Sequence, residues 1–173
     1  MSRYISFNAR LAADAESTDE IEVLLVKITH SLLDEPVRLT SDNTERLSIE
    51  PLTYGTRSTW LTEDGSPFLF IMMGAQIPDE TEDEAPSGSL ILDLGDSEIA
   101  AMLTSTIEPA NVSMAVVLAS SPNIVEFEFL DMKLAAADGD SGQISLSFSK
   151  EPVHEEAFPT ELMTKERFPG LYA

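Results

Sequence analysis

Short runs of apolar and β-branched residues, separated by turn signals, recur along most of this chain. The run at 21–30 alternates in the way that favours a strand, because successive strand side chains point to opposite faces. Residues 37–40 can pair back on it across the turn at 34–36. The pattern predicts a sheet-rich domain of about eight strands, with turns at 63–66 and 137–142. The other strand candidates are 47–52, 56–61, 67–74, 89–94, 112–119, 124–134 and 143–149.

Two segments change from the period of a strand to that of a helix. Residues 6–15 are rich in alanine, and Ser6 can cap their amino end. Residues 96–104 place Ile99, Met102 and Leu103 on one helical face. We therefore expect a mainly β fold over residues 1–150. It would be a two-sheet β-sandwich or flattened barrel with the second helix against one side, preceded by the short N-terminal helix.

Residues 151–173 are expected to form an extended C-terminal arm. Three large apolar side chains lie near its end, around a Pro-Gly break that favours a turn. A terminus of this composition normally has to be tied down. The arm docks either on its own domain or on a neighbouring subunit, and in the second case it forms a subunit interface. The residues of that interface are Phe168, Pro169, Leu171 and Tyr172.

The charge balance is strongly acidic. The chain has 10 Lys and Arg residues against 31 Asp and Glu residues, which gives a formal net charge of -21 at pH 7. No basic residue lies between Arg57 and Lys133. Because such a surface repels phosphate groups, we expect neither direct nucleic-acid binding nor membrane insertion. The negative field of this surface must be solvated, screened by counterions or neutralised by a basic partner.

One segment, at 77–88, concentrates this charge by carrying five carboxylates between two prolines. Like charges repel each other, and proline prevents strand pairing. The segment is therefore expected to be either a solvated loop or a contact with a basic partner that becomes ordered on assembly. The residues of that contact would be Asp79, Glu80, Glu82, Asp83 and Glu84.

The amino end has no apolar run like that of a signal peptide. The longest apolar stretches, such as 68–75, are far shorter than a membrane span. Synthesis in the cytoplasm is therefore the expectation. The chain has no cysteine, which excludes disulfides, thiolate metal sites and cysteine nucleophiles but does not indicate a compartment.

The abundant carboxylates do not form a recognisable metal motif. Residues 138–142 begin like a calcium loop, but Gly142 stands at the fifth position and Ser149 at the twelfth cannot supply a bidentate carboxylate. His30 and His154 are far apart, and neither has a second imidazole at ligand spacing. We predict an ordinary hairpin turn at 137–142, and neither a metal nor another cofactor.

Motifs for catalysis are also missing. Ser31 follows His30 directly, and neighbours on a strand point to opposite faces. The chain has no Gly-x-Ser-x-Gly elbow and no glycine-rich phosphate loop. Paired carboxylates for glycoside cleavage remain an alternative, but acids are so abundant that no one pair is informative. The chain is therefore not expected to be an enzyme.

Two stretches resemble a family of phage-encoded minor tail proteins of undefined function. They are the run at 28–43, Ile-Thr-His-Ser-Leu-Leu-Asp-Glu-Pro-Val-Arg-Leu-Thr-Ser-Asp-Asn, and the ending Phe-Pro-Gly-Leu-Tyr at 168–172. In that family a strand ending near Thr-His leads through a Pro-(Val/Ile)-Arg turn, and the chain closes on Phe-Pro-Gly-Leu-Phe or a similar sequence. The likeness extends over the whole chain, with Ser41 and Tyr172 as mild departures.

The resemblance implies a minor tail protein of a long, non-contractile tail, near the distal end where the tube meets the tip. Such proteins are similar to tail-tube subunits, in which a β-sandwich with one flanking helix assembles as a ring. For Arg38 the resemblance implies a structural role, in a pair with a carboxylate such as Asp42 or with a neighbouring subunit. The expected partners are the tail tube, the tape measure and the tip hub, and a homo-oligomeric hexamer is favoured over a trimer.

The function expected from the sequence is thus that of a structural protein of the virion tail. The alternative is a β-sandwich binding module that recognises a saccharide or another host ligand. Trp60 and Tyr54 could stack a sugar or a base in such a module, although residues of this kind are more often found in a core or an interface. An acid-catalysed hydrolase is a third hypothesis.

Overall fold

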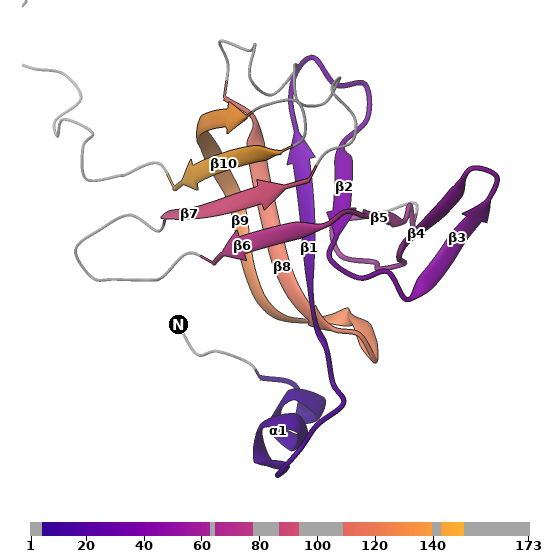
Figure 1. The fold of residues 1–173 in the computed structure, drawn as a ribbon. Helices are drawn as coiled ribbons and strands as arrows, with labels where there is room; N and C mark the ends of the chain where they lie inside the picture. The colour runs from indigo at the N-terminus through magenta and orange to yellow at the C-terminus, as the bar shows by residue number, and fades with distance from the viewer. Residues whose placement is uncertain (1–4, 63–64, 78–86, 94–108, 140–142, 151–173) are drawn as a thin grey trace, which may run out of the picture.

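The computed structural model describes residues 5–62, 65–77, 87–93, 109–139 and 143–150 (Figure 1). Within these ranges the chain forms one α-helix and ten strands. In chain order they are α1 (Phe7–Asp14), β1 (Glu22–Thr29), β2 (Val37–Thr40), β3 (Glu45–Ile49), β4 (Leu52–Thr56), β5 (Phe68–Phe70), β6 (Met73–Gln76), β7 (Ser87–Leu92), β8 (Asn111–Leu118), β9 (Ser121–Gly139) and β10 (Ile144–Ser149).

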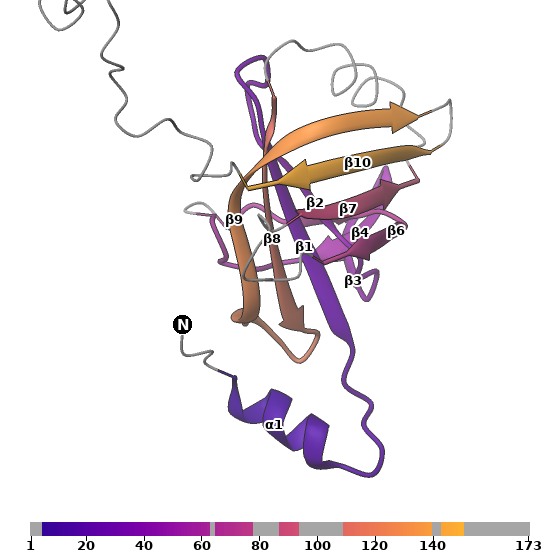
Figure 2. The ribbon, with the colours of Figure 1, turned by 90° about the vertical axis from the view of Figure 1, so that its left-hand side faces the viewer.

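The mainly β fold predicted from the sequence is confirmed. Hydrogen bonds join the ten strands in one sheet, in the order β3-β4-β5-β2-β1-β8-β9-β10-β7-β6. Neighbouring strands are antiparallel except β2 and β5, which run parallel. The sheet is bent, so that β10, β7 and β6 cross over β1 and β8 (Figures 1 and 2). The finer expectation, a tail-tube-like sandwich or barrel, stays a prediction.

Strand β9 is the element that bends the sheet. Its first part, up to Lys133, pairs with β8, and from Lys133 to Gly139 it pairs with β10. Just before this change of partner, Asp131 has a φ of 54°, and its backbone N–H donates a hydrogen bond to Ser113 Oγ at 3.2 Å. The register against β8 shifts at this point, as in a β-bulge. Because a bulge increases the local twist, it turns the second half of β9 away from β8.

Strands β1 and β8 lie in the middle of the sheet and are buried on both faces. Side chains alternate along β1, so that Val26 and Ile28 enter one apolar cluster while Val23 and Leu25 enter another. The larger cluster fills the space beneath the crossing strands, and its members are Val26, Ile28, Leu39, Leu90, Leu92, Ala110, Val112, Met114, Met132, Leu134, Ile144, Leu146 and Phe148. The smaller cluster on the opposite face contains Val23, Leu25, Trp60, Phe68, Ala115 and Val117.

Most of the strands predicted from the sequence are confirmed. The runs at 21–30 and 37–40 form the antiparallel pair β1–β2, and the last four candidates form β7, β8, β9 and β10. Strand β9 is longer than predicted and continues to Gly139. The predicted N-terminal helix is α1, and Ser6 caps it by accepting a hydrogen bond from the Ala9 N–H at 3.1 Å.

Three of the predicted strands are wrong. The strand expected at 47–52 contains the turn between β3 and β4, because the chain reverses at Glu50 and Pro51 and proline has no N–H for a sheet. The strand expected at 56–61 does not form, since residues 57–62 are irregular and bring Trp60 into the smaller cluster. The strand expected at 67–74 is divided into β5 and β6.

Other predictions fall outside the described residues. These are the second helix at 96–104, parts of the turns at 63–66 and 137–142, and the C-terminal arm. The division of the chain at residue 150 therefore stays a prediction.

Candidate functional site

An open groove lies beside β6, which forms one end of the sheet, and β1 and β8 supply its other wall. The groove has a volume of about 180 Å³ and a mostly apolar lining. The lining residues are Glu22, Val23, Leu24, Ser41, Met73, Ala75, Ile77 and Val116. Small-molecule sites usually have roughly 300–1,000 Å³, so this groove suits one or two apolar side chains better than a metabolite.

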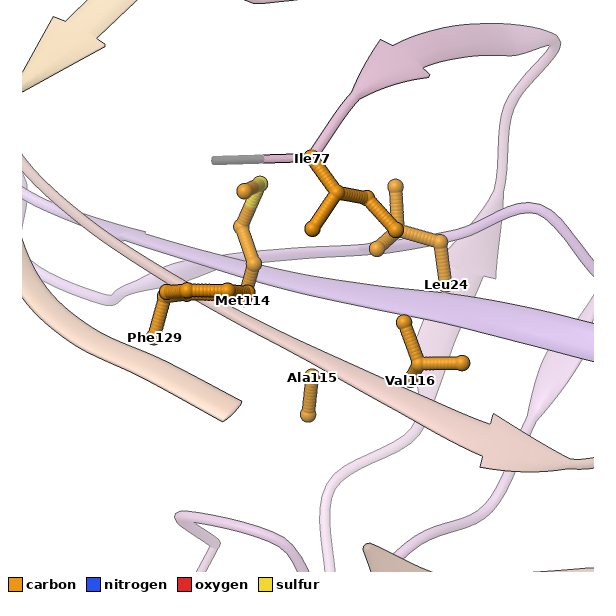
Figure 3. A pocket seen from close by; sticks show the side chains of 6 residues that line it. All are labelled: Leu24, Ile77, Met114, Ala115, Val116 and Phe129. Carbon is orange, nitrogen blue, oxygen red and sulfur yellow. The ribbon is translucent and has the colours of Figure 1, made fainter. Parts of the chain in front are cut away.

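The packing next to the groove is tight. Leu24, Ile77, Met114, Val116 and Phe129 surround a pocket that leaves no space for a water molecule (Figure 3). Figure 3 shows the Ile77 side chain reaching from the end of β6 toward Leu24 of β1. Ile77 nevertheless remains 45% exposed, so part of its side chain is available to another apolar group.

The pairing of β6 with β7 decides which side chains face the groove. Ala75 pairs with Leu90, which belongs to the larger apolar cluster, and Met73 pairs with Leu92 of the same cluster. Gly74 pairs with Ile91, which lies on the opposite face and is 42% exposed. Because cross-strand partners share a face of the sheet, Met73 and Ala75 face β1 and β8 while Ile91 faces away.

Helix α1 projects from the sheet and, along its whole described length, has no buried residue (Figure 2). Phe7 is 73% exposed, and Leu11, one turn later, is 54% exposed. Residues four apart share a helix face, so these two side chains form an apolar stripe. Such a stripe normally packs against another surface.

The amino end of α1 is anchored by a buried carboxylate. The backbone N–H of Ser6 donates to Oε2 of Glu126 at 3.0 Å, and both residues are buried. The other carboxylate oxygen, Glu126 Oε1, finds no hydrogen-bond partner among the described residues. A negative charge at a helix N-terminus is favourable because it meets the positive end of the helix dipole. The carboxylate thus fixes the start of α1, while Ala9, Ala12 and Ala13 line a pocket that the helix shares with Glu22 of β1 and Leu118 of β8.

The β3–β4 hairpin also presents apolar side chains to solvent. Ile49, Leu52 and Tyr54 are exposed on it, and the hairpin extends to one side of the molecule in Figure 1. An exposed ion pair between Arg57 and Glu45 lies at its base. Surface ion pairs of this kind contribute little to stability. Grouped apolar side chains on a folded surface more often mark a contact with another molecule.

Arg38, the residue singled out by the family resemblance, is half-buried on β2 opposite Lys27 of β1. Its expected partner Asp42 is buried, and each oxygen of the Asp42 carboxylate accepts hydrogen bonds. The donors are Thr44 N–H, Thr44 Oγ1 and Thr56 Oγ1, each at 2.9 Å. Asp42 therefore joins the end of β2 to β4, which is a structural role. The pairing of Arg38 with a carboxylate or a neighbouring subunit stays a prediction.

Trp60 is a core residue. It is 6% exposed, its indole Nε1–H donates to Glu128 Oε2 at 3.1 Å, and its ring centroid lies 6.0 Å from that of Phe68. The hydroxyl of Ser58, two residues before Trp60, donates to the carbonyl of Pro122 at 2.6 Å, which ties this segment to the start of β9. A ring held in this way does not offer a stacking face to a sugar or a base.

The described residues contain no group of three or more His, Asp or Glu side chains that could hold a metal ion. On the β9–β10 hairpin, Asp138 pairs with Ser145, and residues 140–142 lie outside the described ranges. His30 follows β1, and its Nδ1 accepts a hydrogen bond from the Leu32 N–H at 3.0 Å, which stabilises a local turn.

No described helix is long and apolar enough to span a membrane.

Two groups of predicted contact residues lie outside the described residues, and their roles stay predictions. They are the acidic residues Asp79, Glu80, Glu82, Asp83 and Glu84, and the arm residues Phe168, Pro169, Leu171 and Tyr172.

Neither the groove beside β6 nor the exposed stripe on α1 was predicted from the sequence. The spacing of Phe7 and Leu11 was a signal that could have indicated the stripe. The groove had no such signal, because its residues come from separate elements that only the fold brings together.

The comparisons with known proteins do not extend this description: no protein-family model matches the chain, and no curated protein matches it. The resemblance at 28–43 and 168–172 therefore depends on those residues alone.

Proposed function

We propose that this protein is a structural, non-enzymatic minor tail protein at the distal end of a phage tail. In this role it forms a ring that joins the tail tube to the tip complex. The observation that carries the proposal is α1, a helix with no buried residue that exposes Phe7 and Leu11. A helix of eight residues is marginal in water by itself, so it needs a surface to cover it.

The arrangement of the exposed surfaces favours a ring. Helix α1 and the β3–β4 hairpin extend from different sides of the molecule (Figure 1). Contacts between two unlike surfaces repeat from copy to copy, and they close into a ring when the rotation permits. We propose a homo-oligomeric ring, with a hexamer favoured over a trimer, in contact with the tail tube, the tape measure and the tip hub.

The charge of the chain fits an assembly role. A net charge of -21 disfavours contact with nucleic acid and anionic membrane, and it raises the attraction of any basic neighbour. In the assembled tail, the acidic residues at 79–84 would meet such a neighbour. The location proposed is the virion tail, after synthesis in the host cytoplasm.

The rival function, a module that binds a host saccharide, has less support. Its main residue, Trp60, is buried in the smaller apolar cluster and hydrogen-bonded to Glu128. The groove beside β6 is small and offers few polar groups for the hydroxyls of a sugar.

The test is the location of the protein in phage particles. A short epitope is inserted after Ala173, particles are purified, and antibody-gold labelling is examined by negative-stain electron microscopy. We expect gold at the distal end of the tail and the protein in the purified particles by mass spectrometry. The proposal is wrong if purified, infectious particles contain none of this protein, or if the label lies on the head.

A further inference from the structure

We propose that the groove beside β6 is the binding site for the C-terminal segment of this chain, residues 167–172. The inference deepens the proposed function and rests on it in one respect: in a ring, the next copy supplies the segment. Occupation of the groove by this segment can be tested without the phage particle.

The groove and the segment match in size and chemistry. The groove has about 180 Å³ between apolar side chains of β1, β6 and β8, and its shared wall with the closed pocket is formed by Leu24, Ile77 and Val116. The segment offers Phe168, Leu171 and Tyr172 within five residues. One or two of these side chains would fill the groove, and removal of their apolar surface from water would stabilise the bound state.

The polar groups of the groove leave little for another ligand. The Ser41 hydroxyl accepts a hydrogen bond from the Leu24 N–H at 3.0 Å, and the Ser41 N–H donates to the Leu24 carbonyl at 3.1 Å. Ser41 is therefore used by the fold. The one charged residue in the lining of the groove is Glu22, which is exposed at the rim.

Glu22 provides charge complementarity. The segment begins with Arg167, directly before Phe168, in a chain with only 10 Lys and Arg residues, and Lys165 and Glu166 just before it cancel in charge. With Phe168 in the groove, Arg167 lies within reach of the rim. An exposed pair with Glu22 would add little affinity, but it would favour one orientation of the segment.

The C-terminal arm is long enough for the segment to reach the groove. Strand β10 ends at Ser149, which pairs with Ser87 of β7, and β7 pairs in turn with β6. Two strand spacings, about 10 Å, therefore separate the start of the arm from β6. The 19 residues from Lys150 to Phe168 can span up to about 60 Å when extended. The segment can thus reach the groove of its own copy or that of a neighbour.

Pro169 determines how the segment can bind. An edge strand such as β6 can pair with another strand through its backbone. Pro169 has no N–H and Pro-Gly favours a turn, so residues 168–172 are poorly suited to extend the sheet. Insertion of side chains into the groove is the mode that fits the segment.

Disulfide trapping in the full-length chain tests the proposal, because the chain has no cysteine of its own. One variant carries Ile77→Cys with Leu171→Cys, and its matched control carries Ile91→Cys with Leu171→Cys. Ile77 and Ile91 are 45% and 42% exposed, but only Ile77 lines the groove. Circular dichroism and thermal melting of the reduced proteins verify that both variants fold.

We expect the Ile77 pair to cross-link at least about tenfold faster than the Ile91 pair, because binding raises the effective concentration of the two thiols. Adding Glu22→Arg should slow this cross-linking, and Arg167→Glu in the same chain should restore it. Equal rates for the Ile77 and Ile91 pairs, or no cross-link for either, would overturn the proposal.

The size of the cross-linked products distinguishes binding of the segment in the groove from exchange of the arm between copies in a ring. A ladder of linked copies on a non-reducing gel supports both the groove and the ring. A fast-migrating, internally linked monomer supports the groove as the site but contradicts exchange of the arm between copies.

Discussion

Strand β8 and helix α1 have the same length, eight residues each, but their apolar side chains have opposite surroundings. Every residue of β8 from Val112 to Leu118 is buried, whereas α1 has no buried residue. The chain thus uses one set of apolar residues to hold its sheet together and exposes another set. This difference indicates that the central strands determine stability, while the projecting elements are available for association.

Substitutions should separate these two roles, and the largest effect on stability is expected in the centre of the sheet. Leu25 of β1 is fully buried in the smaller cluster. Leu25→Ala should lower the free energy of unfolding by about 2–5 kcal/mol, through lost burial and a cavity. The matched control is Leu11→Ala on α1, which should change it by less than about 0.5 kcal/mol. Urea denaturation measures both, and equal losses would contradict the contrast.

A smaller but still large effect is expected where two strands approach closely. A Cβ added at Gly55 of β4 would lie 1.9 Å from the carbonyl oxygen of Phe68, whereas a Cβ at Gly74 of β6 meets nothing within 4 Å. Gly55→Ala should therefore destabilise the protein by about 1–3 kcal/mol or more, because backbone must move. Gly74→Ala should be almost neutral in the same thermal melts. A neutral Gly55→Ala would mean that β4 and β5 are less closely packed than described.

The bulge in β9 should show an intermediate effect. Asp131 has a φ of 54°, a left-handed conformation that is unfavourable for a β-branched residue. Asp131→Val should cost about 1–2 kcal/mol, and Asp131→Gly should cost little or should stabilise. The order of the two melting temperatures is the measurement. Valine equal to or better than glycine would show that the bend does not depend on this conformation.

The smallest effect on global stability is expected at the anchor of α1. Glu126→Ala removes the acceptor of the Ser6 N–H, a loss of about 0.5–1.5 kcal/mol for one hydrogen bond. Amide exchange in residues 7–14 should become faster, while exchange in β1 and β8 should not change. Faster exchange throughout the sheet would show instead that α1 and the central strands unfold as one unit.

The central strands and α1 were also the parts of the fold that the sequence could predict. Burial on both faces requires the apolar run at 112–118, and Ser6 at the start of an alanine-rich segment is a local signal for a helix. The periphery was harder to predict. The turn at Pro51 lies inside an apolar alternating run, and Trp60 leaves the sheet to cover its face, because tertiary packing overrides local preference.

For the candidate site, the sequence could indicate association but not the surfaces used. The apolar character of residues 168–172 is visible in the chain, whereas the groove beside β6 depends on the bend that Asp131 makes in β9. Trp60 could not be assigned to core or ligand site without its contacts to Glu128 and Phe68.

The most direct test of the account is the oligomeric state of the full-length protein, measured by sedimentation velocity over a wide concentration range. The account predicts that a discrete oligomer replaces the monomer as concentration rises. Phe7→Ser with Leu11→Ser should hold the protein as a monomer at an unchanged melting temperature. Leu32→Ser, at an equally exposed position outside α1, should assemble like the wild type. A wild-type protein that stays monomeric throughout, or an α1 variant that assembles normally, would contradict the claim that the exposed apolar surfaces serve assembly.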